Sequence, residues 1–412
     1  MITVISSPQK FSPTNIATFN ISSNSSGLTY FDVKVLNIDN SVIARQKYYP
    51  LPNYTSGATI DLSSVLGASV DSQLLNNSNI VDLPSNMLLS YRLNIVENYL
   101  TGNTIVSGST LTTGAFNVWN GELKRTDVAD FNYQNYAISS STTIPLKFLT
   151  DKPLVNNIYQ DSTEYLYFLN DGLNAKVKID FYTSGNKFLQ TQYVTGITSS
   201  MSAVRLNISP ANLSLNLGLL LGNEFKSQFT AQFGSSVDIL STSYFNVTLV
   251  GAASGRILSE TRTYIIKSTA KCKQTLQLIF SNSLGGYDSL MCSNPQESIT
   301  VERSTITKYP YQLNASGAYT DLNNGIYNET TSIINSTNSS TITCVTDVLS
   351  DSSAKWLRSV ITAKKVYLRL ANGRLYPVSI ANSSYSVQLK KYSTNNNRLT
   401  IQFKSDIAGL FD

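Results

Sequence analysis

The sequence contains no histidine among its 412 residues. Histidine is the commonest general base and the commonest metal ligand in proteins. Its absence excludes a Ser-His-Asp or Cys-His arrangement built from this chain alone. A glycosidase-type pair of carboxylates needs no histidine and is not excluded.

Cysteine is also scarce, with only Cys272, Cys292 and Cys344 in the whole chain. They form no CxxC pair, which excludes a zinc ribbon, and their odd number argues against a disulfide framework. Cys272 and Cys292 could be neighbours across a pair of strands, but we expect three buried thiols. The sequence therefore predicts neither a bound metal nor a cofactor.

Charge is low, because charged residues make up 14% of the chain and the net charge is only +5. A nucleic-acid groove needs a clustered basic face, and no block richer than Lys364-Lys365 or Lys390-Lys391 occurs. No apolar run is long enough for a membrane span, and the first residues, MITVISSPQKF, do not read as an export signal. We expect no direct contact with nucleic acid or with a membrane.

What the chain has in abundance is aromatic and uncharged polar residues, with 24 Tyr and 16 Phe. Short runs such as YFDVKVLNI and KVKIDFYT alternate apolar and polar residues, which is typical of half-buried strands. Asn372-Gly373 lies between two such runs and is a strong hairpin signal. The sequence predicts a mainly β fold.

A weak internal repeat divides the first two thirds of the chain. IDLSSVL at residues 60–66 and LNISPANL at 206–213 each read as a strand that runs into a short helical turn. We therefore predict two tandem Ig-like or fibronectin-like β-sandwiches. The first covers 1–120, and a linker with the second covers 121–268.

The remaining part, 269–412, differs in character, and we predict a β-rich α+β domain with one helix at Asp351 to Ala363. Trp356, Leu357, Val360 and Ile361 would share one face of this helix. An Asn/Ser/Thr-rich tract at 314–340 precedes it. We interpret that tract as a long surface loop or part of an interface.

The stretch FSNSLGGYDSL, residues 280–290, is the most distinctive local motif. It lacks the lysine and the following helix of a phosphate-binding loop, and it is not a G-x-S-x-G elbow. We interpret Gly285 and Gly286 as a backbone turn with positive φ and Asp288 as a side chain that caps this turn. With Tyr287, these residues are a structural turn that could also form an interface.

No pair of acidic residues stands out as catalytic. Asp161 and Glu164, like the other acidic groups, are interpreted as caps or members of solvated loops. Tyr48, Tyr49 and Tyr54 form the best cluster of aromatic residues for contact with a ligand, although core or edge-strand positions also explain them. We expect no enzymatic activity.

Several segments together resemble a family of virion structural proteins of tailed bacteriophages that infect Bacteroidetes, including crAss-like phages. FSNSLGGYDSL is the most specific of them, and the others are SPQKFSPTNIATFNI, IDLSSVL, KFLTDKPLVNNIYQDSTEYLYFLN, SDSSAKWLRSVITAKKVYL and LYPVSI. The resemblance is loose in most motifs but extends over nearly the whole chain. It implies a place in the tail, collar or baseplate and supplies no catalytic residue.

The leading hypothesis is thus a non-enzymatic tail, neck or baseplate subunit. It would form a homo-oligomeric ring, join other virion proteins and be assembled in the host cytoplasm. The alternative hypothesis is a receptor- or glycan-binding adhesin or tail fibre protein. It predicts an exposed aromatic cluster such as Tyr48, Tyr49 and Tyr54.

Overall fold

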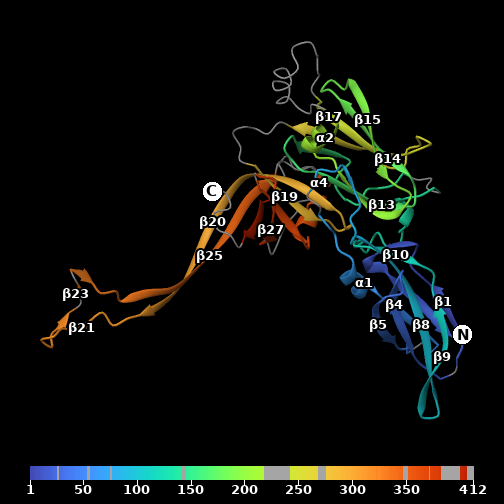
Figure 1. The fold of residues 1–412 in the computed structure, drawn as a ribbon, viewed down its shortest axis with the longest axis horizontal. Coiled ribbons are helices and arrows are strands. Elements are labelled where there is room, and N and C mark those ends of the chain that lie inside the picture. Colours follow the sequence, from blue (N-terminus) through green and yellow to red (C-terminus); the bar gives the residue numbers. More distant parts are fainter. Residues whose placement is uncertain are drawn as a thin grey trace.

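The structure is a computed structural model that describes most of the chain. The described residues are 1–25, 27–52, 56–74, 77–140, 145–217, 242–267, 275–320, 322–323, 325–346, 351–370, 372–381 and 400–405. The fold is mainly β, as the alternating runs predicted. Along the chain the strands form three groups of sheets, which we call the first (1–120), second (121–267) and third (275–405) units (Figure 1).

The first unit consists of two sheets around one core. Its strands are β1 (Ile2–Ser6), β2 (Phe11–Pro13), β3 (Thr18–Ser23), β4 (Leu28–Asn37), β5 (Val42–Tyr48), β6 (Gly57–Asp61), β8 (Leu88–Thr101), β9 (Thr104–Thr112) and β10 (Phe116–Trp119). One sheet has the order β1-β3-β6 and the other β2-β10-β8-β4-β5, with β9 beside β8. Alternate side chains such as Phe19 and Val33 meet between the sheets, as expected for strands with one buried face. Helix α1 (Ser63–Ser69) and the 3-10 turn η1 (Thr14–Ile16) complete the unit.

The second unit repeats this two-sheet arrangement. Its elements are η2 (Tyr133–Asn135), β11 (Ala137–Ile138), β12 (Val155–Tyr159), β13 (Tyr165–Asp171), β14 (Ala175–Tyr182), β15 (Phe188–Ile197), β16 (Met201–Asn207), α2 (Pro210–Leu217), β17 (Tyr244–Gly251) and β18 (Arg262–Lys267). The sheet orders are β11-β13-β16-β7, where β7 is Val81–Asp82, and β12-β18-β17-β14-β15. In both units a strand runs into a short helix, β6 into α1 and β16 into α2, as the internal repeat predicted.

One strand crosses the predicted boundary at residue 120. Strand β7 (Val81–Asp82) belongs to the first unit by sequence, yet it pairs with β16 at the edge of a second-unit sheet. An ion pair between Arg205 and Asp82 fixes this pairing, and the Arg205 side chain is fully buried. The two units therefore share a sheet and are not simply joined by a linker.

The third unit is a closed barrel with the strand order β19-β20-β25-β28-β27-β26. The strands are β19 (Thr275–Ser281), β20 (Tyr287–Thr307), β25 (Thr331–Thr346), β26 (Val366–Arg369), β27 (Leu375–Ile380) and β28 (Thr400–Ser405). Strands β26 and β27 form the hairpin predicted at Asn372-Gly373, and Gly373 has a positive φ of 79°.

The helix predicted over 351–363 is two short helices, α4 (Asp351–Trp356) and α5 (Arg358–Ile361). The hydroxyl of Ser359 donates to the carbonyl oxygen of Trp356 at 2.6 Å. It thereby competes with the backbone N–H groups of the helix for that carbonyl. Trp356, Leu357 and Val360 nevertheless enter the barrel core, as the apolar face predicted.

Strands β20 and β25 continue far beyond the barrel as a two-stranded ribbon (Figure 1). We call residues 298–339 the arm; its outer part carries β21 (Gln312–Leu313), β22 (Tyr319–Thr320), β23 (Leu322–Asn323) and β24 (Ile326–Tyr327). Residues 331–340 of this tract lie in strand β25, so the interpretation as a surface loop was wrong there, and the alternative that the tract is part of an interface stays a prediction. Its threonines, with Ile333 and Ile334, are residues that suit an extended chain.

Candidate functional site

The FSNSLGGYDSL stretch is the hairpin that joins β19 to β20. Gly285 has a φ of +94°, as predicted, but Gly286 is not in the positive region. The cap of the turn is Asn282, because its side-chain oxygen accepts from the backbone N–H groups of Leu284 and Gly286, both at 3.0 Å. The prediction that Asp288 caps this turn was wrong.

The two glycines let this hairpin press against the backbone of both other units. A Cβ atom on Gly285 would overlap the carbonyl oxygen of Asn120 in the first unit. A Cβ on Gly286 would lie 2.9 Å from the carbonyl oxygen of Leu149 in the second unit. The double glycine is thus required by close approach at a three-way junction, in addition to the turn itself.

Hydrogen bonds fasten the hairpin to the first unit. The indole N–H of Trp119 donates to the Leu284 carbonyl at 3.1 Å, and the Tyr287 hydroxyl donates to the Ser72 carbonyl at 3.0 Å. The Ser72 hydroxyl donates to the Gly285 carbonyl. All of these polar groups are buried, so each unmade bond would cost about 1–3 kcal/mol.

A single hydrophobic cluster surrounds these bonds and draws on all three units. Strand β13 supplies part of it, because its side chains alternate between two cores: Leu166 and Phe168 face the core of the second unit, whereas Tyr165, Tyr167 and Leu169 face the junction. The junction cluster consists of Phe11, Met87, Trp119, Leu123, Ala137, Leu149, Tyr165, Tyr167, Leu169, Ala203, Ile279, Leu284 and Tyr287.

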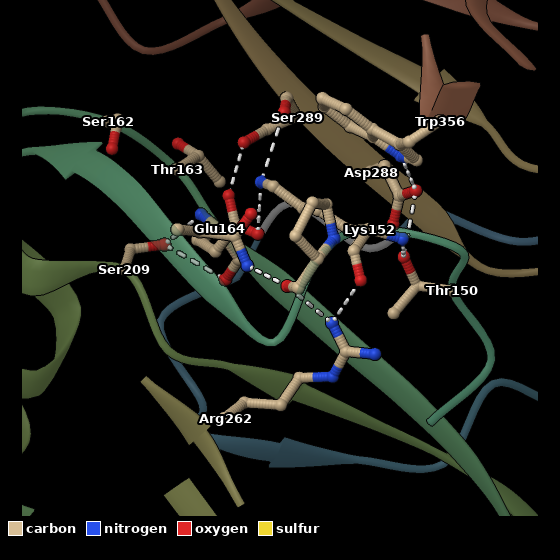
Figure 2. A network of polar contacts seen from close by, with 12 residues as sticks. Thr150, Lys152, Ser162, Thr163, Glu164, Ser209, Arg262, Asp288, Ser289 and Trp356 are labelled. Carbon is tan, nitrogen blue, oxygen red and sulfur yellow. Dashed lines mark hydrogen bonds and ion pairs between the residues drawn. The ribbon is translucent and has the colours of Figure 1, made fainter. Parts of the chain in front are cut away.

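Asp288 lies beside this cluster with its carboxylate fully enclosed (Figure 2). It accepts hydrogen bonds from the Thr150 hydroxyl at 2.9 Å, the Trp356 indole at 2.6 Å and the Asn282 amide at 3.1 Å. Burial raises the pKa of the Asp288 carboxyl, while nearby Lys152 and these hydrogen bonds oppose the rise. One side chain thereby ties the second unit to α4 and to the barrel.

The second buried carboxylate is Glu164, which was interpreted from sequence as a cap or a solvated loop residue. It is instead 1% exposed and pairs with Lys152 at 2.6 Å. The Ser289 hydroxyl also donates to Glu164, and Lys152 donates to the Ser289 carbonyl at 3.2 Å (Figure 2). Burial raises the pKa of the Glu164 carboxyl, and the Lys152 ammonium opposes this.

Other groups hold Lys152 in place. The Arg262 guanidinium donates to the Lys152 carbonyl at 2.9 Å and forms an ion pair with Glu260 at 2.8 Å. The Lys152 ammonium also lies 5.2 Å from the centre of the Trp356 ring, a cation–π distance. We call Thr150, Lys152, Glu164, Asp288, Ser289 and Trp356 the junction network.

The chemistry of the junction network is that of a fixed structural joint. Each carboxylate is occupied by donors from at least two partners, and the Lys152 ammonium is shared between Glu164 and a carbonyl. Within the described residues no group of three or more Asp, Glu or Cys side chains is placed to hold a metal ion. No described helix is both long and apolar enough to span a bilayer.

Of the three tyrosines in the predicted aromatic cluster, the structure describes Tyr48 and Tyr49, which have different surroundings. Tyr48 is half-buried against the core of the first unit, and its hydroxyl donates to the Asp61 carbonyl at 3.0 Å. Tyr49 is 64% exposed and lies beside Tyr30, with the ring centres 6.0 Å apart. Tyr54 lies outside the described residues.

The cysteines have different outcomes. Cys292 and Cys344 are both buried in the barrel core, as expected for two of the thiols. Cys272 lies outside the described residues, so the hypothesis that it neighbours Cys292 stays untested.

Sequence reasoning found the hairpin but missed the residues that surround it, Lys152, Glu164 and Trp356. The only local signal was that a low-charge chain places Lys152 and Glu164 close to apolar runs. No protein-family model matches this chain, and no curated protein matches it either.

Proposed function

We propose that the chain is a non-enzymatic structural subunit of a bacteriophage virion. It acts in the tail, the neck or collar, or the baseplate, where copies form a ring and join neighbouring virion proteins. Assembly of the particle places it in the host cytoplasm first and in the virion afterwards.

The observation that carries this proposal is the arm. A two-stranded ribbon without a third strand or a packed face is only marginally stable in water. Every described side chain from 298 to 307 is exposed, as are Tyr309, Tyr319 and Tyr327 farther out. Such a ribbon is typical of a protein whose stable form is an assembly, because a neighbour then supplies the missing contacts.

The junction supports the same reading. A subunit that transmits load within a particle needs its parts held in a fixed relation. The hairpin at Gly285 and the junction network connect the three units through buried hydrogen bonds and a buried ion pair.

The proposal is tested by quantitative mass spectrometry of purified particles from a phage that carries this gene. We expect the chain in the particles at a fixed copy number, because a closed ring contains a set number of copies. Absence from particles, combined with presence in infected cells, would refute the proposal. In that case exposed Tyr49, beside half-buried Tyr30, makes glycan binding the next function to assay.

A further inference from the structure

Strand β15 is an edge strand of the five-stranded sheet in the second unit. It pairs with β14 on one side, and no other described strand pairs with its outer edge. Its sequence, FLQTQYVTGI, contains no charged residue and no proline. Edge strands normally carry such residues because they block unwanted pairing. Edge strand β5 of the first unit follows that rule, with Arg45 and Lys47.

Apolar side chains lie exposed along the same strand. Phe188 is 51% exposed and Tyr193 is 56% exposed. An edge that combines unpaired backbone with exposed aromatic rings is a surface that another strand can extend.

The arm offers a strand of matching kind. Between residues 331 and 339, β25 pairs only with β20, so its other edge is open among the described residues. The sequence of this segment, TSIINSTNS, has no charge and no proline, whereas the opposite strand carries Glu302 and Arg303. The nine residues of this β25 segment are therefore similar in length and polarity to the ten residues of β15.

The exposed apolar area of the arm is large enough for a stable contact. Four tyrosines are between 52% and 82% exposed, and at about 200 Å² for each aromatic side chain they offer roughly 550 Å². The described aliphatic side chains that add to this area are Ile299, Val301, Ile306, Leu313, Ile326, Ile333 and Ile334. A standard protein interface uses about 800 Å² on each partner.

We propose that the arm of one copy docks on β15 of a second copy, where β25 adds to the five-stranded sheet as a sixth strand. This inference rests on the proposed function and names the partner of the arm. The arm leaves the barrel on the side of the molecule opposite to β15, so it cannot reach the β15 edge of its own chain (Figure 1). A second copy provides the same edge at equal concentration.

Such a contact joins two different surfaces, the arm and β15. It is therefore heterologous, and it generates a closed ring when the rotation between copies closes.

The test uses the full chain and sedimentation over a range of concentrations. We expect self-association of the unmodified chain. Tyr193→Lys, and separately Ile333→Lys, would weaken it by about tenfold or more, because each places a charge on a pairing edge. Tyr49→Lys is the matched control, since Tyr49 is similarly exposed, 64% against 56% for Tyr193, but lies in the first unit. Circular dichroism and melting checks that all three variants fold.

The contact is located by a photo-cross-linking amino acid at Phe188 in a mixture of light and heavy isotope-labelled chains. We expect mixed light–heavy cross-links between position 188 and residues of the arm. Cross-links confined to one copy overturn the inference, as does self-association that Tyr193→Lys leaves unchanged. A chain that stays monomeric at every concentration also overturns it. Particle mass spectrometry remains a separate test, so the proposed function can stand when this inference fails.

Discussion

Replacement of Gly285 by alanine tests whether the junction holds the three units together. The added methyl group causes two penalties. A non-glycine residue at a φ of +94° costs about 1–3 kcal/mol in backbone strain. The methyl group also overlaps the Asn120 carbonyl, and relief of that overlap costs about 1–3 kcal/mol more because the obstacle is backbone. We expect Gly285→Ala to lower the free energy of unfolding by about 4 kcal/mol.

The control is Gly373→Ala in the same barrel. Gly373 also has a positive φ, 79°, but a Cβ atom there would meet nothing within 4 Å. Only the conformational penalty of about 1–2 kcal/mol applies. The difference between the two variants therefore isolates the contact between units.

The measurement is urea denaturation of both variants, followed by limited proteolysis of each under native conditions. We expect Gly285→Ala, and not Gly373→Ala, to open cleavage between the units. Equal losses of stability in the two variants would refute the argument that close approach to Asn120 requires a glycine.

Three further predictions concern charged groups at the junction. Burial raises the folded-state pKa of Glu164 and of Asp288. We therefore expect their contribution to the free energy of unfolding to be greatest below their unfolded pKa values near 4, and to fall as pH rises through the raised folded-state values. Urea denaturation between pH 4 and 8 checks this, and Glu164→Gln should flatten the pH profile. Lys152→Met would leave the buried Glu164 carboxylate without its counter-charge and lower the free energy of unfolding by about 3–5 kcal/mol. Adding Glu164→Gln to the same chain would recover part of this stability. Thermal unfolding of the single and double variants measures this, and no recovery would contradict the pairing. Lys364→Ala removes an exposed ion pair to Glu122, and we expect it to lower the free energy of unfolding by less than about 1 kcal/mol. Because salt at 1 M screens this pair, urea denaturation in 1 M salt should find the variant and the parent chain equally stable.

The sequence predicted the features that depend on neighbouring residues. Period-two alternation identified strands such as β14, where every second side chain is buried, and Asn372-Gly373 identified a hairpin. The β25 strand of the arm was missed because Ser, Thr and Asn occupy both of its faces, so it shows no regular alternation of polarity that could be recognised.

The junction network could not be predicted because its partners are far apart in the chain. Thr150 and Asp288 are separated by 138 residues, and Glu164 and Ser289 by 125. No local pattern encodes such a pairing. The sequence shows only isolated polar residues, and it is tertiary packing that buries and pairs them.

The distance along the chain between the parts of this junction has a consequence for biosynthesis. The Ser72 carbonyl cannot accept its hydrogen bond until Tyr287, 215 residues later, has been synthesised. The Trp119 indole likewise lacks its acceptor until Leu284, 165 residues later, has been synthesised. At a synthesis rate of about 5–20 residues per second, the nascent first unit carries an uncovered indole on its surface for roughly 10–30 seconds. Ribosome-bound chains that stop before residue 284 are therefore the species in which a chaperone would find a binding site.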